Sequence, residues 1–150
     1  MTQNADTQFG LQTRPGGKPL SEAIFSHGET LRVQVKASGN GFLYLMGLDA
    51  EGLVYPILPN PWFPENRVTA GQTLVVPSPD QEKAGLLLTA TLPEGIQRTV
   101  ETILAVVSEK PIPLLTTLES GKDSLPALMG RLADLDPTAA RQVVGYEIRR

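Results

Sequence analysis

The single histidine of the sequence, His27, is the side chain best suited to acid–base chemistry. It stands in Ser26-His27-Gly28-Glu29, where an imidazole next to a hydroxyl and a carboxylate could activate a nucleophile. A hydrolase of this kind would need His27 within about 3 Å of both groups. Neighbouring residues of a turn or strand point in different directions, however, and no Gly-x-Ser-x-Gly motif occurs. The sequence therefore favours a turn histidine that precedes a strand, and a minor hydrolase is the weaker alternative.

Carboxylates are the next candidates, because pairs of them can act as acid and base or bind metal ions. The acids that could form local pairs are Asp49, Glu51, Asp80, Glu82, Asp123, Asp134 and Asp136. Asp49-Ala-Glu51-Gly52 lacks the twelve-residue ligand pattern of a calcium loop, and turn chemistry accounts for its Asp and Gly. A glycosidase needs two carboxylates across a cleft, and the 5% aromatic content is low for a sugar platform. We predict no catalytic residues, no metal and no cofactor.

Motifs and composition exclude phosphate loops, cysteine-based sites and an electrostatic surface for nucleic acid. The glycines at Gly16-Gly17 and Gly39-Asn40-Gly41 are not followed by the Gly-Lys-Ser/Thr of a phosphate loop. The absence of cysteine removes thiolate catalysis, disulfides and cysteine zinc sites. A net charge of −3 offers no electrostatic basis for binding nucleic acid.

Two aromatic residues, Trp62 and Phe63, are the best candidates for a contact site. They lie in the loop 59–66, which three prolines stiffen and remove from any strand ladder. A large aromatic there either folds back onto the core as a plug or stands out as a binding anchor. Tyr44 and Tyr55 on the preceding strands could complete a ligand pocket together with Trp62. We take these four residues as tentative binding residues.

The elements around these residues are mainly strands. Leu31, Val33, Val35 and Ala37 alternate with polar residues, as in a half-buried strand. We expect further strands near 8–14, 42–48, 53–58, 85–92, 99–108 and 142–149, with the apolar 99–108 in the centre of a sheet. Residues 68–71 and 73–77 supply one more short strand, which Pro77 and Pro79 end. Gly52 closes the hairpin between 42–48 and 53–58. The stretch 25–29 is expected to be a turn.

A change of period marks one helix near the C-terminus. Leu125, Leu128, Met129, Leu132 and Leu135 recur at helical spacing, with Asp123 or Ser124 as N-cap and Pro126 in the first turn. The helix is expected at about 124–135. The predicted fold is an antiparallel β-sandwich or partly open barrel of about seven strands with this one helix, in a single domain over 1–150.

The ends of the chain bear on its compartment. The N-terminus shows no basic region followed by an apolar run, and no segment approaches the ~20 apolar residues of a membrane span. We therefore predict no membrane insertion. The location is cytoplasmic if Met1 is the natural start, and extracytoplasmic or envelope-associated if the chain is an excised domain.

The strand pattern carries a family resemblance. It rests on Gly28-Glu29, Leu31-Arg-Val-Gln-Val, Gly41-Phe-Leu-Tyr-Leu, Asp49-Ala-Glu-Gly, Leu58-Pro-Asn60, Asn66-Arg-Val-Thr-Ala-Gly71 and Glu101-Thr-Ile-Leu-Ala-Val-Val-Ser108. Over about 20–112 the chain resembles the bacterial domain-of-unknown-function family 4384. The resemblance implies an accessory domain beside signalling, protease-like or envelope modules, with no catalytic residues. The family usually has a less aromatic loop after Pro-Asn, so Trp62 and Phe63 cannot be interpreted by analogy.

These observations favour a non-enzymatic protein-interaction module of a bacterial signalling, secretion or envelope-associated system. Its partner would be another protein or a neighbouring domain of the same polypeptide, and weak self-association is left open. The alternative is a domain that senses a small ligand or a glycan.

Overall fold

A six-stranded sheet forms the centre of the fold. The computed structural model describes residues 9–12, 22–37, 39–48, 51–137 and 139–150. The strand order is β2 (Ile24–Ser26), β11 (Ala140–Arg149), β10 (Arg98–Ser108), β5 (Gly41–Leu48) and β6 (Val54–Leu58), and β7 (Arg67–Val68) also pairs with β5. Neighbouring strands run antiparallel except for β2 and β11, which are parallel.

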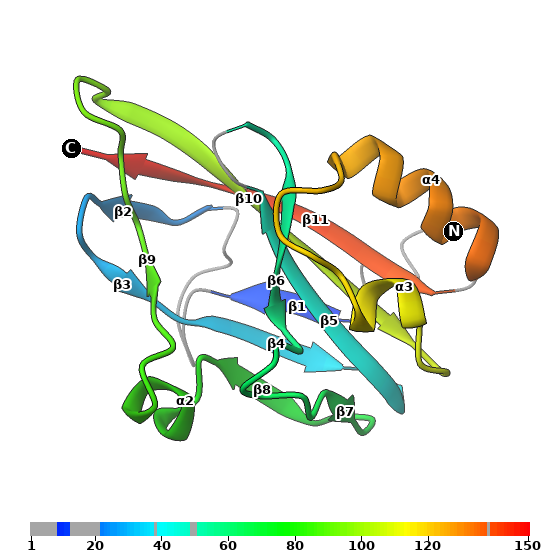
Figure 1. Ribbon diagram of the computed structural model, residues 1–150. Coiled ribbons are helices and arrows are strands. Elements are labelled where there is room, and N and C mark those ends of the chain that lie inside the picture. Colours follow the sequence, from blue (N-terminus) through cyan, green and yellow to red (C-terminus); the bar gives the residue numbers. More distant parts are fainter. Residues whose placement is uncertain (1–8, 13–21, 38, 49–50, 138) are drawn as a thin grey trace.

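Two further layers cover this sheet, one on each face (Figure 1). One layer is a three-stranded sheet in the order β1 (Phe9–Gln12), β4 (Val33–Ala37) and β8 (Thr73–Val76). The opposite layer is formed by α3 (Pro113–Thr116) and α4 (Leu125–Leu135). We call the two faces of the central sheet the sandwich face and the helix face. Beyond these layers, β3 (Thr30–Leu31) pairs with β9 (Leu88–Thr89), and α2 (Pro79–Lys83) follows β8. The fold is therefore a mainly β, sandwich-like structure and not a closed barrel.

The core consists of two clusters that share the central sheet. On β10, Ile103, Ala105 and Val107 pack on the sandwich face with residues of β4 and β8. Leu104 and Val106 pack on the helix face with residues of α3 and α4. Both faces of β10 are buried, which explains its continuous apolar run and confirms the prediction of a central strand.

Several other predicted elements are confirmed. The helix α4 begins after Ser124, whose side chain accepts a hydrogen bond from the N–H of Ala127. The hairpin of β5 and β6 has Gly52 at φ +79°, in the region that glycine adopts most readily. The last strand alternates as expected, with Val144 and Ile148 buried.

The structure corrects the prediction at other places. The expected strand 31–37 is interrupted at Arg32, because β3 and β4 pair with strands of different sheets. The expected strand 85–92 shrinks to the two residues of β9. Phe25 and Ser26, expected as the start of a turn, belong to β2, and the turn begins at His27. The described residues thus form eleven strands and three helices, where about seven strands and one helix were predicted.

The two helices that were not predicted both begin at a proline. Ser78 caps α2 through a capping box with Gln81, and Pro79 occupies the first turn. Pro113 likewise occupies the first turn of α3, where the N-cap residue Ile112 makes no side-chain hydrogen bond. The sequence pattern predicts Pro79 only as the end of a strand, although proline is also favoured in the first turn of a helix.

Candidate functional site

The loop 59–66 is held in shape by Asn60. The Oδ1 atom of Asn60 accepts hydrogen bonds from the N–H groups of Trp62 (2.9 Å) and Phe63 (3.0 Å). Its Nδ2 atom donates to the carbonyl of Ile57 at 2.9 Å. The backbones of Asn60 and Phe63 also bond to each other in both directions, at 3.1 and 3.2 Å. One amide side chain therefore fixes both ends of the turn that carries the two aromatic residues.

Trp62 and Phe63 differ sharply in burial. Trp62 is 81% exposed, whereas Phe63 is partly buried against the sandwich-face cluster. The plug alternative therefore describes Phe63, whereas the exposure of Trp62 leaves its role as a binding anchor a prediction. Phe63 packs on the core, and Trp62 stands in solvent.

The two tyrosines lie on opposite faces of the central sheet. Tyr44 is 1% exposed on the helix face, where its hydroxyl accepts a hydrogen bond from the N–H of Ile112 at 2.8 Å. Tyr55 packs on the sandwich face, and its ring lies over Gly47, where a Cβ atom would come within 2.5 Å of the ring. Tyr44, Tyr55 and Trp62 therefore do not line one pocket, and Tyr44 acts as a buried link between β5 and the start of α3.

His27 forms a structural hydrogen bond. Its Nδ1 atom accepts from the N–H of Leu92 at 2.8 Å, and its backbone N–H donates to the carbonyl of Arg149 at 2.9 Å. The nearby Glu29 carboxylate accepts from the backbone N–H of Ser26 at 3.0 Å. This geometry ties the turn after β2 to the segment before β10. It does not assemble a hydroxyl, an imidazole and a carboxylate.

Two of the described acids from the predicted pairs are bound to arginines. Arg32 binds Glu82 at 2.9 Å, and Arg131 binds Asp123. Asp49 lies outside the described residues. Within the described part of the chain, no three His, Asp or Glu side chains are grouped so that they could hold a metal ion.

Three side chains with shifted pKa values lie on the paired strands β10 and β11. Burial raises the pKa of the Glu101 carboxyl. It also raises the pKa of the Tyr146 phenol, to which the charges of Glu101 and Tyr55 add a smaller contribution. The hydrogen bond from Arg149 lowers the pKa of Glu147. Glu101 and Tyr146 are direct cross-strand neighbours, so the packing of the sheet explains both of their shifts.

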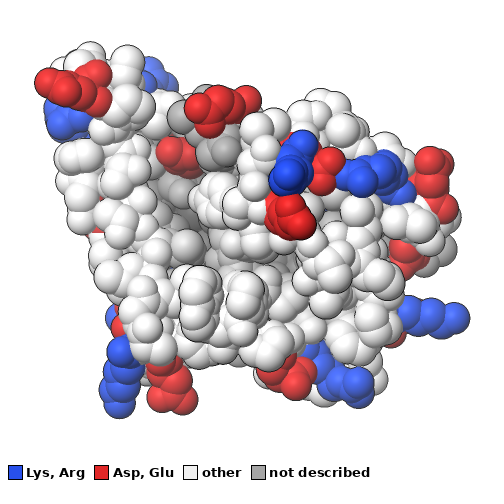
Figure 2. Space-filling view, in the orientation of Figure 1, with Lys and Arg blue, Asp and Glu red and all other residues white. Residues whose placement is uncertain are grey.

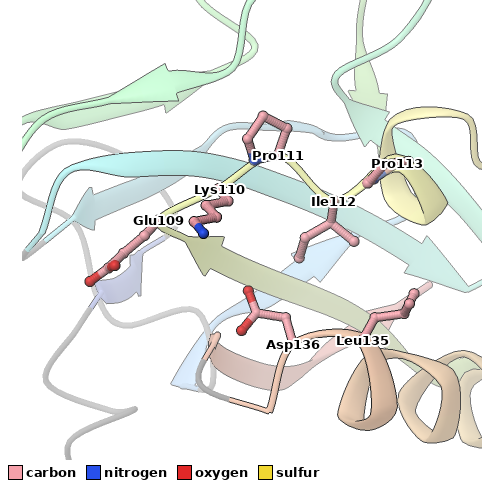
Figure 3. A pocket seen from close by; sticks show the side chains of 7 residues that line it. All are labelled: Glu109, Lys110, Pro111, Ile112, Pro113, Leu135 and Asp136. Atoms are coloured by element: carbon pink, nitrogen blue, oxygen red, sulfur yellow. The ribbon is translucent and has the colours of Figure 1, made fainter.

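Two adjacent hollows lie at the end of the sheet where β10 stops. The first, of about 470 Å³, opens between the segment after β10 and the end of α4 (Figure 3), and its lining residues are Glu109, Lys110, Pro111, Ile112, Pro113, Leu135 and Asp136. The second, of about 540 Å³, is lined by Asn40, Gly41, Phe42, Arg67, Val68, Thr69 and Glu109. Glu109 borders both hollows. Their walls come from distant parts of the chain, so no local sequence pattern could have indicated them.

The charged residues of these walls are of both signs. Arg67 stacks over the ring of Phe42, with its guanidinium carbon 5.1 Å from the ring centre. Lys110 lies between the two acids Glu109 and Asp136 (Figure 3). On the face of the molecule drawn in Figure 2, acids and bases are likewise interspersed among uncharged residues, and the described residues there form no continuous basic patch. These hollows could accept a small polar group, but they contain no histidine that could act as a base.

Comparison with known proteins gives one match. The family model of a domain of unknown function, DUF4384, matches residues 24–111, which is more than half of the chain. No curated protein and no solved structure matches the chain. The matched range agrees with the resemblance that the strand motifs indicated over about 20–112.

Proposed function

The chain belongs to the domain-of-unknown-function family DUF4384, and on that premise we propose that it is a non-enzymatic accessory module that binds another protein or a neighbouring domain of its own polypeptide. The proposed setting is a bacterial signalling, secretion or envelope-associated system. Among the helices of the described residues, none has the length and apolar character that a membrane crossing requires.

One observation carries the proposal, and that is the presentation of Trp62. An indole that is 81% exposed leaves a large apolar surface in water. Asn60 already fixes the backbone on which it stands, so a partner that covers Trp62 orders little additional chain. Tryptophan is also among the residues that most often anchor protein interfaces.

The geometry at His27 supports a role other than catalysis. Its Nδ1 atom is occupied by the N–H of Leu92, so it is not available as a base in this arrangement. The carboxylates of Glu82 and Asp123 are occupied by arginines.

The proposal can be tested by substituting Trp62. Trp62→Ala should weaken the capture of a purified partner by roughly thirtyfold or more, since a buried aromatic anchor contributes about 2 kcal/mol or more. The stability of the variant should stay within about 0.5 kcal/mol of the wild type, because the side chain is exposed. Leu87→Ala is a matched control, since Leu87 is another exposed apolar residue, at 53%.

Fluorescence gives a direct readout, because Trp62 is the only tryptophan of the chain. Burial of the indole by a partner should shift its emission to the blue. If Trp62→Ala binds as tightly as the wild type, or if Leu87→Ala loses binding equally, the loop is not the anchor.

The alternative, a sensor of a small ligand, is favoured by the two hollows that meet at Glu109. Their volumes of about 470 and 540 Å³ lie within the usual range for ligand sites. Saturable binding of a small molecule that Arg67→Ala abolishes and Trp62→Ala leaves intact would favour this function instead.

A further inference from the structure

Among the described residues, the outer edge of β11 has a strand neighbour along only part of its length. On one side, β11 pairs with β10 from Ala140 to Arg149. On the other side, β2 covers only the last residues, Glu147–Arg149. The described residue Glu22 is in a helical turn and does not extend β2 along this edge. Within the described part of the chain, residues 140–146 therefore have a strand neighbour on one side only.

The direction of the free backbone groups follows from the bonds at β2. The N–H of Glu147 donates to the carbonyl of Ala23 at 3.3 Å, and the carbonyl of Arg149 accepts from the N–H of His27 at 2.9 Å. Backbone groups alternate in direction along a strand, so those of Arg141, Val143 and Gly145 point to the same outer edge. Among the described residues, these outward N–H and C=O groups have no hydrogen-bond partner.

Such an edge is a template for pairing with another strand. Native proteins usually protect long edges with proline, lysine or a bulge. Residues 140–146 contain neither proline nor lysine, and their register against β10 has no bulge.

We propose that this edge pairs with the same edge of a second copy of the chain, antiparallel and about a two-fold axis at Val143. In this register Val143 faces Val143 of the second copy, and Arg141 faces Gly145. Every outward N–H of the edge then meets an outward C=O of the other copy. The two central sheets become one continuous sheet, and the interface is self-complementary, as two-fold symmetry requires.

The side chains of the edge suit this occupant. Val143 is 48% exposed on the helix face, and the proposed register places it against its own symmetry mate. Gly145 leaves room for Arg141 of the second copy. Glu147 lies two residues further on the same face, so the diagonal neighbours across the interface have opposite charges. No like charges face each other.

The length of the edge points to the same occupant. At one end β2 begins opposite Glu147. At the other end the chain turns away from the strand, where the N–H of Ala139 donates to the carbonyl of Asp136 at 3.3 Å. An incoming strand can therefore pair with residues 140–146 only, and this is the stretch that a second copy presents.

A single-cysteine cross-link tests the register directly, because the chain has no cysteine of its own. In Val143→Cys the two Cα atoms would lie about 5.5 Å apart, which a disulfide can span. Val100→Cys is the matched control, since Val100 is a 62% exposed valine of the neighbouring strand β10 and lies away from the proposed axis. Under mild oxidation, covalent dimers should accumulate at least about tenfold faster for Val143→Cys. Equal rates would overturn the proposal.

Sedimentation measures the association itself. The wild type should form dimers that dissociate on dilution, and Val143→Pro should raise the dimer Kd roughly thirtyfold or more, because it removes both central hydrogen bonds. The N–H of Val143 is not used by β10, so the edge tolerates proline there. Val143→Lys places two like charges at the axis and should have the same effect if the proline variant fails to fold. Val143→Thr keeps the N–H and the strand preference, and should still dimerise.

The outcomes separate this edge from the loop that carries Trp62. That loop follows β6, which forms the edge of the central sheet opposite to the edge near β11. Trp62→Ala should therefore keep the dimer, and if it abolishes association, self-pairing at β11 is overturned. A wild type that stays monomeric up to about 1 mM also overturns it. So does a monomer whose edge binds only an extended peptide of another sequence.

Discussion

Gly41 offers a sharp test of how closely β5 and β10 are packed. A Cβ atom at this position would lie 2.9 Å from the carbonyl carbon of Ser108 and nearer still to its oxygen. Both atoms belong to the backbone of the neighbouring strand, so no side chain can rotate away to make room. Gly41→Ala therefore requires the ends of β5 and β10 to separate, where Phe42 pairs with Ser108.

The expected size of the effect follows from this clash. Overpacking a rigid site costs about 1–3 kcal/mol and sometimes more, and the backbone contact places Gly41→Ala near about 3 kcal/mol. For a domain of this length, that corresponds to a fall in Tm of roughly 6–12 °C.

The same substitution in α4 is the control. Gly130 is an exposed helix residue, and a Cβ atom there would meet nothing within 4 Å. Gly130→Ala should therefore stabilise the protein by about 0.5–1 kcal/mol through helix propensity. Thermal and urea unfolding by circular dichroism measures both variants. If Gly41→Ala is as stable as the wild type, the close approach of β5 and β10 is refuted.

Three further predictions concern the core, the last strand and pH. Leu132→Ala should lower the free energy of unfolding by about 2–5 kcal/mol, because Leu132 is fully buried. Leu135→Ala should change it by less than about 0.5 kcal/mol, because Leu135 is 62% exposed. Urea unfolding measures both variants. Deletion of residues 141–150 removes the strand between β2 and β10, so a cooperative thermal transition should be lost, and an unchanged midpoint would contradict the observed sheet. Burial raises the pKa of Glu101 above 4.5, so the folded state binds this proton more tightly and stability falls as pH rises through that value. Glu101→Gln should therefore be more stable than the wild type at pH 7 and lose this advantage below about pH 4; urea unfolding at both pH values decides this.

The sequence alone determined where most of the long elements lie. Alternation identifies β4 and β11, and the continuous apolar run of β10 indicates a strand buried on both faces. The spacing of Leu125, Leu128 and Leu132 predicts α4 because the helical period brings these residues to one side. These signals are local, and each can be recognised within one element.

Other features depend on contacts between distant residues. Three residues are too few for a period, so β2 is defined by its pairing with β11. The interruption at Arg32 exists because β3 and β4 have different partners. The residues of a strand do not by themselves determine its pairing partner or its position in a sheet.

The candidate sites show the same division. The proline-rich loop and its aromatic pair were evident from the sequence, but adjacent aromatic residues do not reveal which one packs inward. The bonds of Asn60 and the neighbouring core decide that Phe63 packs and Trp62 is exposed. The sequence is compatible with Tyr44 and Tyr55 lining one pocket, but the tertiary structure places them on opposite faces of the sheet. Within the described residues, β2 is short and covers only the end of the β11 edge, and only the assembled sheet shows which backbone groups are left to bind a partner.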